Sequence, residues 1–126
     1  MNDFISMIIL LAGAVAIHEI GHLIALKIYK KKYKMKLTWL GIMIDFDMYS
    51  CRPIEIYLIS IAGILAGFIV LTPSASYETM LLYLIMCPID ITNCIMMMNY
   101  GKYKDMTMRE IMLKELSIVV SVDKGK

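Results

Sequence analysis

The chain has 126 residues, enough for one domain, and 60% of them are hydrophobic, above the roughly 45–50% that is usual for soluble proteins. The net charge of +2 is small, and the basic residues leave long gaps that a nucleic-acid-binding patch would not show. The three cysteines are an odd number, and no disulfide framework is predicted.

The first predicted element is a membrane-spanning helix from Phe4 to Leu26. Glu19 is its single formally charged residue, and about 20 predominantly apolar residues are enough to cross a bilayer. A lysine-rich stretch follows from Lys27 to Lys36, and no Lys or Arg precedes it. Because short loops rich in Lys and Arg stay in the cytoplasm, we expect the N-terminus outside the cell membrane and this stretch inside.

Within this helix lies the sequence His18-Glu19-Ile20-Gly21-His22, an H-E-x-x-H motif. Residues four apart share one face of a helix, so both imidazoles can bind one metal ion. Glu19 lies one step round the helix, where its carboxylate can act as general base toward an attacking water. The alternative is a chance spacing of two core histidines, but a Glu and two histidines in hydrocarbon would cost several kcal/mol without a partner.

The motif and its position in a first transmembrane helix resemble the site-2 protease family of intramembrane zinc metalloproteases. The resemblance implies a membrane-embedded core, a Zn²⁺ ion held by two His and one Asp, and cleavage of membrane-associated proteins or peptides. By this resemblance, His18 and His22 are metal ligands and Glu19 is the catalytic residue. The close match covers the first helix, and the rest of the chain matches in architecture only.

The next segment, residues 36–49, is predicted to form one or two short strands. Its side chains alternate between two sides, with Thr38, Leu40, Ile42, Ile44 and Phe46 on one and Trp39, Gly41, Met43 and Asp45 on the other. The family resemblance implies a small membrane-associated sheet here, and an exposed strand edge can bind an extended substrate by strand addition. An interfacial loop packed on the helices is the alternative. Asp45 and Asp47 are predicted to be solvated.

A second membrane-spanning helix is predicted from Ile54 to Leu71. Pro53 suits the first turn of a helix, and Glu55 is the single charged residue in the mainly apolar run that follows. The small residues in Ala62–Gly67 would let this helix pack closely on the first. The stretch is similar to an Ala-Gly-Pro-x-Ala-Asn-like segment of the family but lacks its Pro and Asn. We therefore assign it to helix packing.

A third membrane-spanning helix is predicted from Thr79 to Tyr100, after an outer turn at residues 72–78. Asp90 is its single charged residue. Pro88 is expected to kink the helix and to free a backbone carbonyl near that carboxylate.

Basic residues return after Gly101, so the C-terminus is predicted to be cytoplasmic. Residues 107–116 alternate apolar and charged side chains at near-helical spacing and predict an amphipathic helix on the membrane surface. The fold class is therefore a multi-pass α-helical membrane protein with three transmembrane helices, a short membrane-associated β segment after the first, and a C-terminal amphipathic helix. Residues 1–126 are expected to form a single membrane-embedded, metalloprotease-like domain.

A catalytic zinc usually has three protein ligands, and the chain has two histidines, so the third ligand must be Asp, Glu or Cys. Depth in the membrane favours Asp90. At about 1.5 Å per residue, His18 and His22 lie roughly 9–15 Å from the inner end of their helix, and Asp90 lies roughly 15 Å from the inner end of its own. An Asp inside a membrane helix is a functional candidate by default.

Asp105 is the main alternative. The family ligand commonly sits in an Asp-Gly pair some residues after an Asn, and Asn93 followed by Asp105 resembles a stretched version of that pattern. Neither Asp105 nor Asp90 is followed by Gly, so the pattern decides for neither. The two lysines next to Asp105, Lys102 and Lys104, place it at the surface.

Three neighbours of Asp90 are further candidates. Cys87 and Cys94 could be ligands, although core packing is the alternative for Cys94. Asn93 lies one turn along the helix and could orient Asp90, a water or the substrate carbonyl, which makes it a candidate substrate-binding residue. A hydrogen bond between helices is the alternative for Asn93.

The sequence therefore predicts an intramembrane zinc metallopeptidase that acts on membrane-associated proteins or peptides within the lipid bilayer, with no nucleic-acid partner. One alternative is a non-catalytic metal- or peptide-binding membrane protein of the same fold, which the intact Glu19 disfavours. Another is a small membrane partner or chaperone subunit whose charged groups only pair within the bundle. Measuring bound metal distinguishes the small membrane partner from the other two possibilities. Measuring peptide cleavage distinguishes the non-catalytic binding protein from the enzyme.

Overall fold

The computed structural model of the chain describes residues 2–38 and 41–125. Most of them are helical, and the sheet that they form has two strands. In chain order the elements are α1 (Asn2–Ile28), β1 (Tyr33–Thr38), β2 (Gly41–Phe46), the short 3₁₀ helix η1 (Met48–Ser50), α2 (Pro53–Leu71), α3 (Tyr77–Ile85), α4 (Pro88–Asn99) and α5 (Met108–Lys124).

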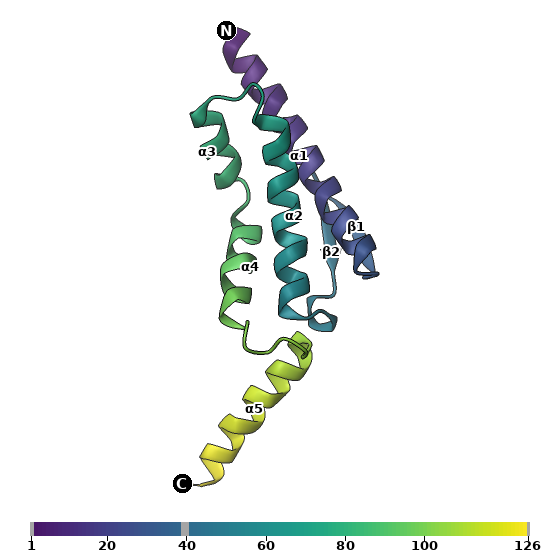
Figure 1. Ribbon diagram of the computed structural model, residues 1–126, viewed down its shortest axis with the longest axis vertical. Coiled ribbons are helices and arrows are strands. Elements are labelled where there is room, and N and C mark those ends of the chain that lie inside the picture. The colour runs from purple at the N-terminus through teal and green to yellow at the C-terminus, as the bar shows by residue number, and fades with distance from the viewer. Residues whose placement is uncertain (1, 39–40, 126) are drawn as a thin grey trace.

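The helices α1 and α2 run side by side as the main pair, and α4 packs on α2 (Figure 1). Small residues allow the close approach, because a Cβ atom at Gly21 of α1 would lie 2.5 Å from the carbonyl oxygen of Ala62 and 2.8 Å from Ala66 Cβ. The predicted packing role of Ala62–Gly67 is therefore confirmed. Both α1 and α2 are long and apolar enough to cross a membrane.

The third predicted span was expected as one helix over residues 79–100, and this expectation is wrong. α3 and α4 are separate helices whose axes are bent by 71°. Pro88 explains the break, since it has no N–H to bond to the Leu84 carbonyl, which accepts instead from the Cys87 N–H at 3.0 Å. The described residues thus contain two helices able to span a membrane, or three spans if the bent pair counts as one.

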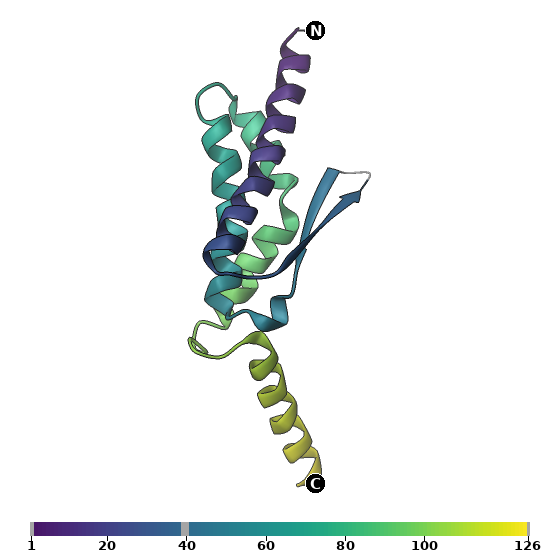
Figure 2. The ribbon, with the colours of Figure 1, turned by 90° about the vertical axis from the view of Figure 1, so that its right-hand side faces the viewer.

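The strands β1 and β2 form an antiparallel hairpin next to α1 (Figure 2). Ile44 and Phe46, which the sequence pattern placed on the same side of the strand, pack with the buried Leu26 and Ile59 of the α1–α2 pair. The predicted residues 39 and 40, Trp and Leu, lie outside the described residues. The hairpin favours the strand prediction over a loop, and binding of a substrate to its edge stays a prediction.

The bounds of the β segment differ from the predicted 36–49. The hairpin begins earlier, at Tyr33, because α1 ends at Ile28 and Lys30 then adopts a left-handed conformation with φ of 53° that turns the chain. It ends earlier, at Phe46, because the residues that follow form η1.

Two carboxylates near the end of β2 are exposed, as predicted. Asp47 caps η1, and its side chain accepts a hydrogen bond from the Tyr49 N–H at 3.0 Å. Asp45 lies 2.7 Å from the Lys36 ammonium across the hairpin, which lowers the pKa of the Asp45 carboxyl.

The amphipathic helix, predicted over residues 107–116, continues as α5 to Lys124. Thr107 and Glu110 start it with a capping box, in which each side chain accepts a hydrogen bond from the other residue's N–H. No Gly or Pro follows before Gly125, so nothing ends the helix at the predicted residue. α5 projects from one end of the helix pair (Figures 1 and 2). Its described side chains are exposed except at Met108, which is half-buried, and Ile111, which is buried.

Candidate metal centre

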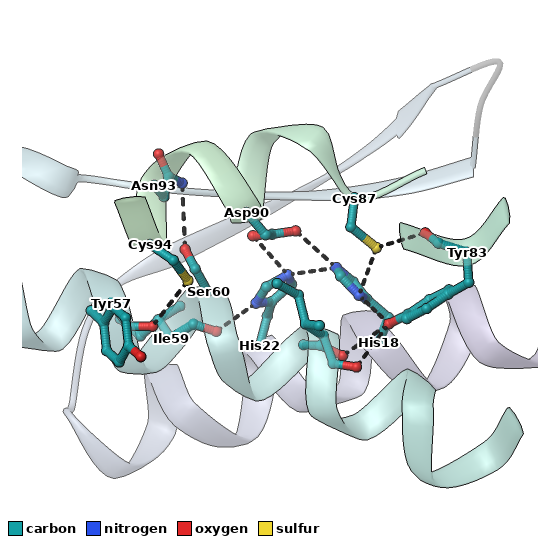
Figure 3. A network of polar contacts seen from close by, with 12 residues as sticks. His18, His22, Tyr57, Ile59, Ser60, Tyr83, Cys87, Asp90, Asn93 and Cys94 are labelled. Carbon is teal, nitrogen blue, oxygen red and sulfur yellow. Dashed lines mark hydrogen bonds and ion pairs between the residues drawn. The ribbon is translucent and has the colours of Figure 1, made fainter. Parts of the chain in front are cut away.

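Two histidines of α1 and one aspartate of α4 meet inside the helix bundle (Figure 3). His18 and His22 are one helical turn apart and only 6% and 9% exposed. Asp90 lies in the first turn of α4, and its side chain is 17% exposed. The break before α4 matters here, because the positive end of a helix dipole stabilises a carboxylate in the first turn.

The three side chains direct potential ligand atoms to one place. His18 Nε2 lies 2.9 Å from His22 Nε2 and 3.0 Å from Asp90 Oδ2, and His22 Nε2 lies 3.4 Å from Asp90 Oδ1. Two ligand atoms bound at about 2.1 Å to a tetrahedral zinc ion lie roughly 3.4 Å apart. The observed separations are at or slightly below that value, and His18, His22 and Asp90 form a group that could hold a metal ion.

The hydrogen bond made by His22 Nδ1 determines which nitrogen of this ring is free to bind a metal. His22 Nδ1 lies 2.8 Å from the carbonyl oxygen of Ile59, which can only accept a hydrogen bond, so Nδ1 carries the proton. In the neutral imidazole, Nε2 then keeps its lone pair toward Asp90. Gly63 makes room for the ring, since a Cβ atom there would overlap it. α2 therefore orients His22 through one carbonyl and one glycine.

The charge of the group also favours a cation. Among the described residues, the ion-pair partners of Asp90 are the two histidines, and none is a Lys or Arg. A carboxylate removed from water needs a nearby cation, which either a metal ion or a proton on an imidazole can supply. Two imidazole nitrogens and a carboxylate are a ligand set that suits zinc and other first-row divalent metals.

Glu19 lies beside this group without being part of it. It is half-buried on α1, where it follows His18 directly and precedes His22 by three residues. Within residues 2–38 and 41–125 its carboxylate forms no hydrogen bond or ion pair. A carboxylate beside potential metal ligands, with no partner among the described residues, is available to take up and release protons.

Asp105, the alternative third ligand, is not in the group. It is exposed in the connection between α4 and α5, where it lines a hollow of about 510 Å³ with Arg52, Pro53 and Lys104. The depth argument placed Asp90 level with His18 and His22 in the membrane, and its contacts with both histidines agree with that argument.

The two cysteines near Asp90 lie outside the group of His18, His22 and Asp90. Cys87 Sγ lies 3.7 Å from His18 Nδ1, the ring nitrogen opposite the one that faces Asp90. Cys94 Sγ lies 3.9 Å from the carbonyl oxygen of Tyr57. Neither thiol joins the ligand group among the described residues.

Asn93 contacts α2. Its side-chain amide donates to Ser60 Oγ at 3.4 Å, which is the hydrogen bond between helices considered as the alternative to substrate binding. A role of Asn93 in binding substrate stays a prediction.

The structure adds a residue that sequence reasoning missed. Tyr83 of α3 is fully buried, and its hydroxyl lies 2.7 Å from His18 Nδ1. One signal was present, because Tyr83 precedes Asp90 by seven residues, close to two helical turns. An aromatic side chain in an apolar span usually packs in the core, so this spacing did not single it out.

No protein-family model matches the chain, and searches of curated proteins and of solved structures find no match either. The resemblance to site-2 proteases is therefore carried by the H-E-x-x-H motif in the first helix. What the protein does is inferred from its own residues and their arrangement.

Proposed function

We propose that this protein is an intramembrane zinc metallopeptidase of the site-2 protease type, which hydrolyses peptide bonds of membrane-associated proteins or peptides. One observation carries the proposal. His18, His22 and Asp90 bring three potential ligands from two helices to one place. Glu19 follows His18 directly on α1, and its carboxylate has no hydrogen bond or ion pair within the part of the chain that the structure describes. Catalytic zinc sites have this number of protein ligands, together with an open position.

The residues take distinct parts in this reaction. His18 Nε2, His22 Nε2 and the Asp90 carboxylate would hold the metal, and a bound zinc would supply Lewis acidity toward the scissile carbonyl and the attacking water. Glu19 accepts a proton from that water and returns it to the leaving amine as the peptide C–N bond breaks. One water is added across the peptide bond, so Glu19 ends with the charge it began with. Comparing wild type with Glu19→Gln for zinc content and for cleavage of co-expressed membrane peptides tests the proposal.

In this proposal the protein crosses the cell membrane three times, and the bent α3–α4 pair forms the third span. The contact of Lys31 Nζ with Glu55 Oε2 at 3.0 Å brings the lysine-rich stretch after α1 to the start of α2. The connection between α4 and α5 lies at that end as well, since Arg52 and Lys104 line one hollow. The positive-inside rule assigns this end to the cytoplasm.

Reporter fusions test this orientation. Fusions at the N-terminus and at Ser74, in the turn between α2 and α3, are expected to report an outside location, and fusions at Lys32 and the C-terminus a cytoplasmic one. A cytoplasmic Ser74 would contradict three spans of alternating direction.

A further inference from the structure

We infer that Tyr83 is a positioning residue of the metal site, whose hydroxyl accepts a hydrogen bond from His18 Nδ1–H and thereby directs His18 Nε2 at the metal. The inference rests on the proposed metal site and deepens it. It assigns a role to α3, the half of the broken span that carries no ligand.

The hydrogen bonds of the Tyr83 hydroxyl determine the direction of its contact with His18. Its oxygen lies 3.2 Å from the carbonyl oxygens of both Gly63 and Ile64, which can only accept, so its single proton is directed at α2. With the hydroxyl proton directed at α2, the 2.7 Å contact with His18 Nδ1 uses the proton of the imidazole. His18 consequently keeps its lone pair on Nε2, which lies 3.0 Å from Asp90 Oδ2.

Both histidines thus donate a hydrogen bond from Nδ1, the ring nitrogen that does not face Asp90. His22 Nδ1–H donates to a backbone carbonyl, and His18 Nδ1–H donates to the Tyr83 hydroxyl. Histidines that bind metals generally donate their second N–H to an acceptor, which fixes the tautomer and the orientation of the ring. Tyr83 supplies that acceptor from a helix other than the one that carries the ligand.

The position of Tyr83 is fixed by packing on several sides. A Cβ atom at Gly67 of α2 would overlap its hydroxyl, so only glycine leaves room there. The ring of Phe68 packs edge-on at a centroid distance of 5.4 Å, and the ring of His18 does so at 5.9 Å. The fully buried side chain therefore holds its hydroxyl in one place.

Cys87 is the other group near His18 Nδ1, and it is the weaker partner. Its sulfur lies 3.7 Å from that nitrogen and contacts the backbone carbonyl of Tyr83 at 3.2 Å. A thiol is a weak acceptor, whereas a phenolic oxygen at 2.7 Å is a good one. Tyr83 and Asp90 therefore contact opposite nitrogens of one imidazole, from the two sides of the helix break.

The variant Tyr83→Phe tests this inference, because it keeps the ring and removes only the hydroxyl. We expect its zinc affinity to fall by about tenfold or more, the usual scale for losing a group that holds a ligand. NMR of zinc-loaded protein labelled with ¹⁵N-histidine gives the second measurement, since the chain has only two histidines. The Nδ1–H signal of His18 is expected to shift or to exchange faster with water, while that of His22 stays unchanged. The protein must be purified without a polyhistidine tag.

The matched control is Tyr57→Phe, which removes a hydroxyl from α2 that has no hydrogen bond among the described residues. It is expected to keep the zinc affinity and both histidine signals of the wild type. Unchanged affinity and an unchanged His18 signal in Tyr83→Phe would overturn the inference. Equal changes in both histidine signals would also overturn it, because they would show a general disturbance of the bundle. A wild-type protein that binds no zinc would contradict the proposed function itself.

Discussion

Replacing Glu19 by Gln is expected to abolish peptide cleavage while the protein keeps its zinc. Gln has nearly the same shape as Glu, but its amide cannot accept a proton from water at neutral pH. General base catalysis contributes about 10²–10⁴-fold to a reaction rate, so cleavage should fall by at least about a hundredfold. Zinc should stay because Glu19 is outside the group of His18, His22 and Asp90. Cleavage is measured on co-expressed membrane peptides, and zinc by metal analysis of the purified protein.

The control for this variant is Glu115→Gln, the same chemical change at an exposed position on α5. It is expected to cleave like the wild type. Cleavage by Glu19→Gln at the wild-type rate would show that Glu19 is not the general base. If the wild type and Glu19→Gln both bind zinc and neither cleaves any peptide, the protein is the non-catalytic metal-binding alternative.

Asp90→Ala is expected to lose both cleavage and most zinc binding. The reason is electrostatic, since a carboxylate in apolar surroundings requires a cation and no Lys or Arg lies between Pro53 and Gly101. With two neutral imidazoles, the carboxylate also reduces the net charge of a bound Zn²⁺. Zinc affinity should fall at least tenfold, because even the loss of a residue that only hydrogen-bonds to a metal ligand usually lowers metal affinity by that factor. Zinc titration and the peptide-cleavage assay measure the two effects.

Asp105→Ala is the matched control, because Asp105 is exposed and outside the ligand group. It should leave zinc binding and cleavage nearly intact. If Asp105→Ala destroyed activity and Asp90→Ala were mild, the assignment of the third ligand would be wrong. α4 would then have to end earlier, with the following connection folded back toward His18.

The part of the site that local sequence could predict is the part built on one helix. His18 and His22 share a face because they are four residues apart, and this spacing depends on no other element. Asp90 required an argument about depth, since its helix meets α1 only in the folded protein. The contacts at 3.0 and 3.4 Å agree with that argument, although the predicted helix is broken.

The features that sequence reasoning missed depend on contacts between distant segments. Pro88 predicted a kink, but it did not predict a bend of 71°, the packing of α3 on α1 and α2, or the packing of α4 on α2. Gly63 and Gly67 were assigned only to helix packing, whereas each faces a ring, that of His22 and that of Tyr83 respectively. Alternation of small residues along one helix cannot show which side chain of another helix fills the space.

Zinc content of the purified protein tests the metal site most directly. Wild-type protein in mild detergent is expected to hold about one zinc per chain, and His18→Ala and His22→Ala are each expected to lose most of it. The loss follows because each variant removes one of the ligand atoms that meet at Asp90. Equal zinc content in the wild type and in both variants, or none in any of them, would contradict the site and leave His18, His22 and Asp90 as groups that only pair within the bundle.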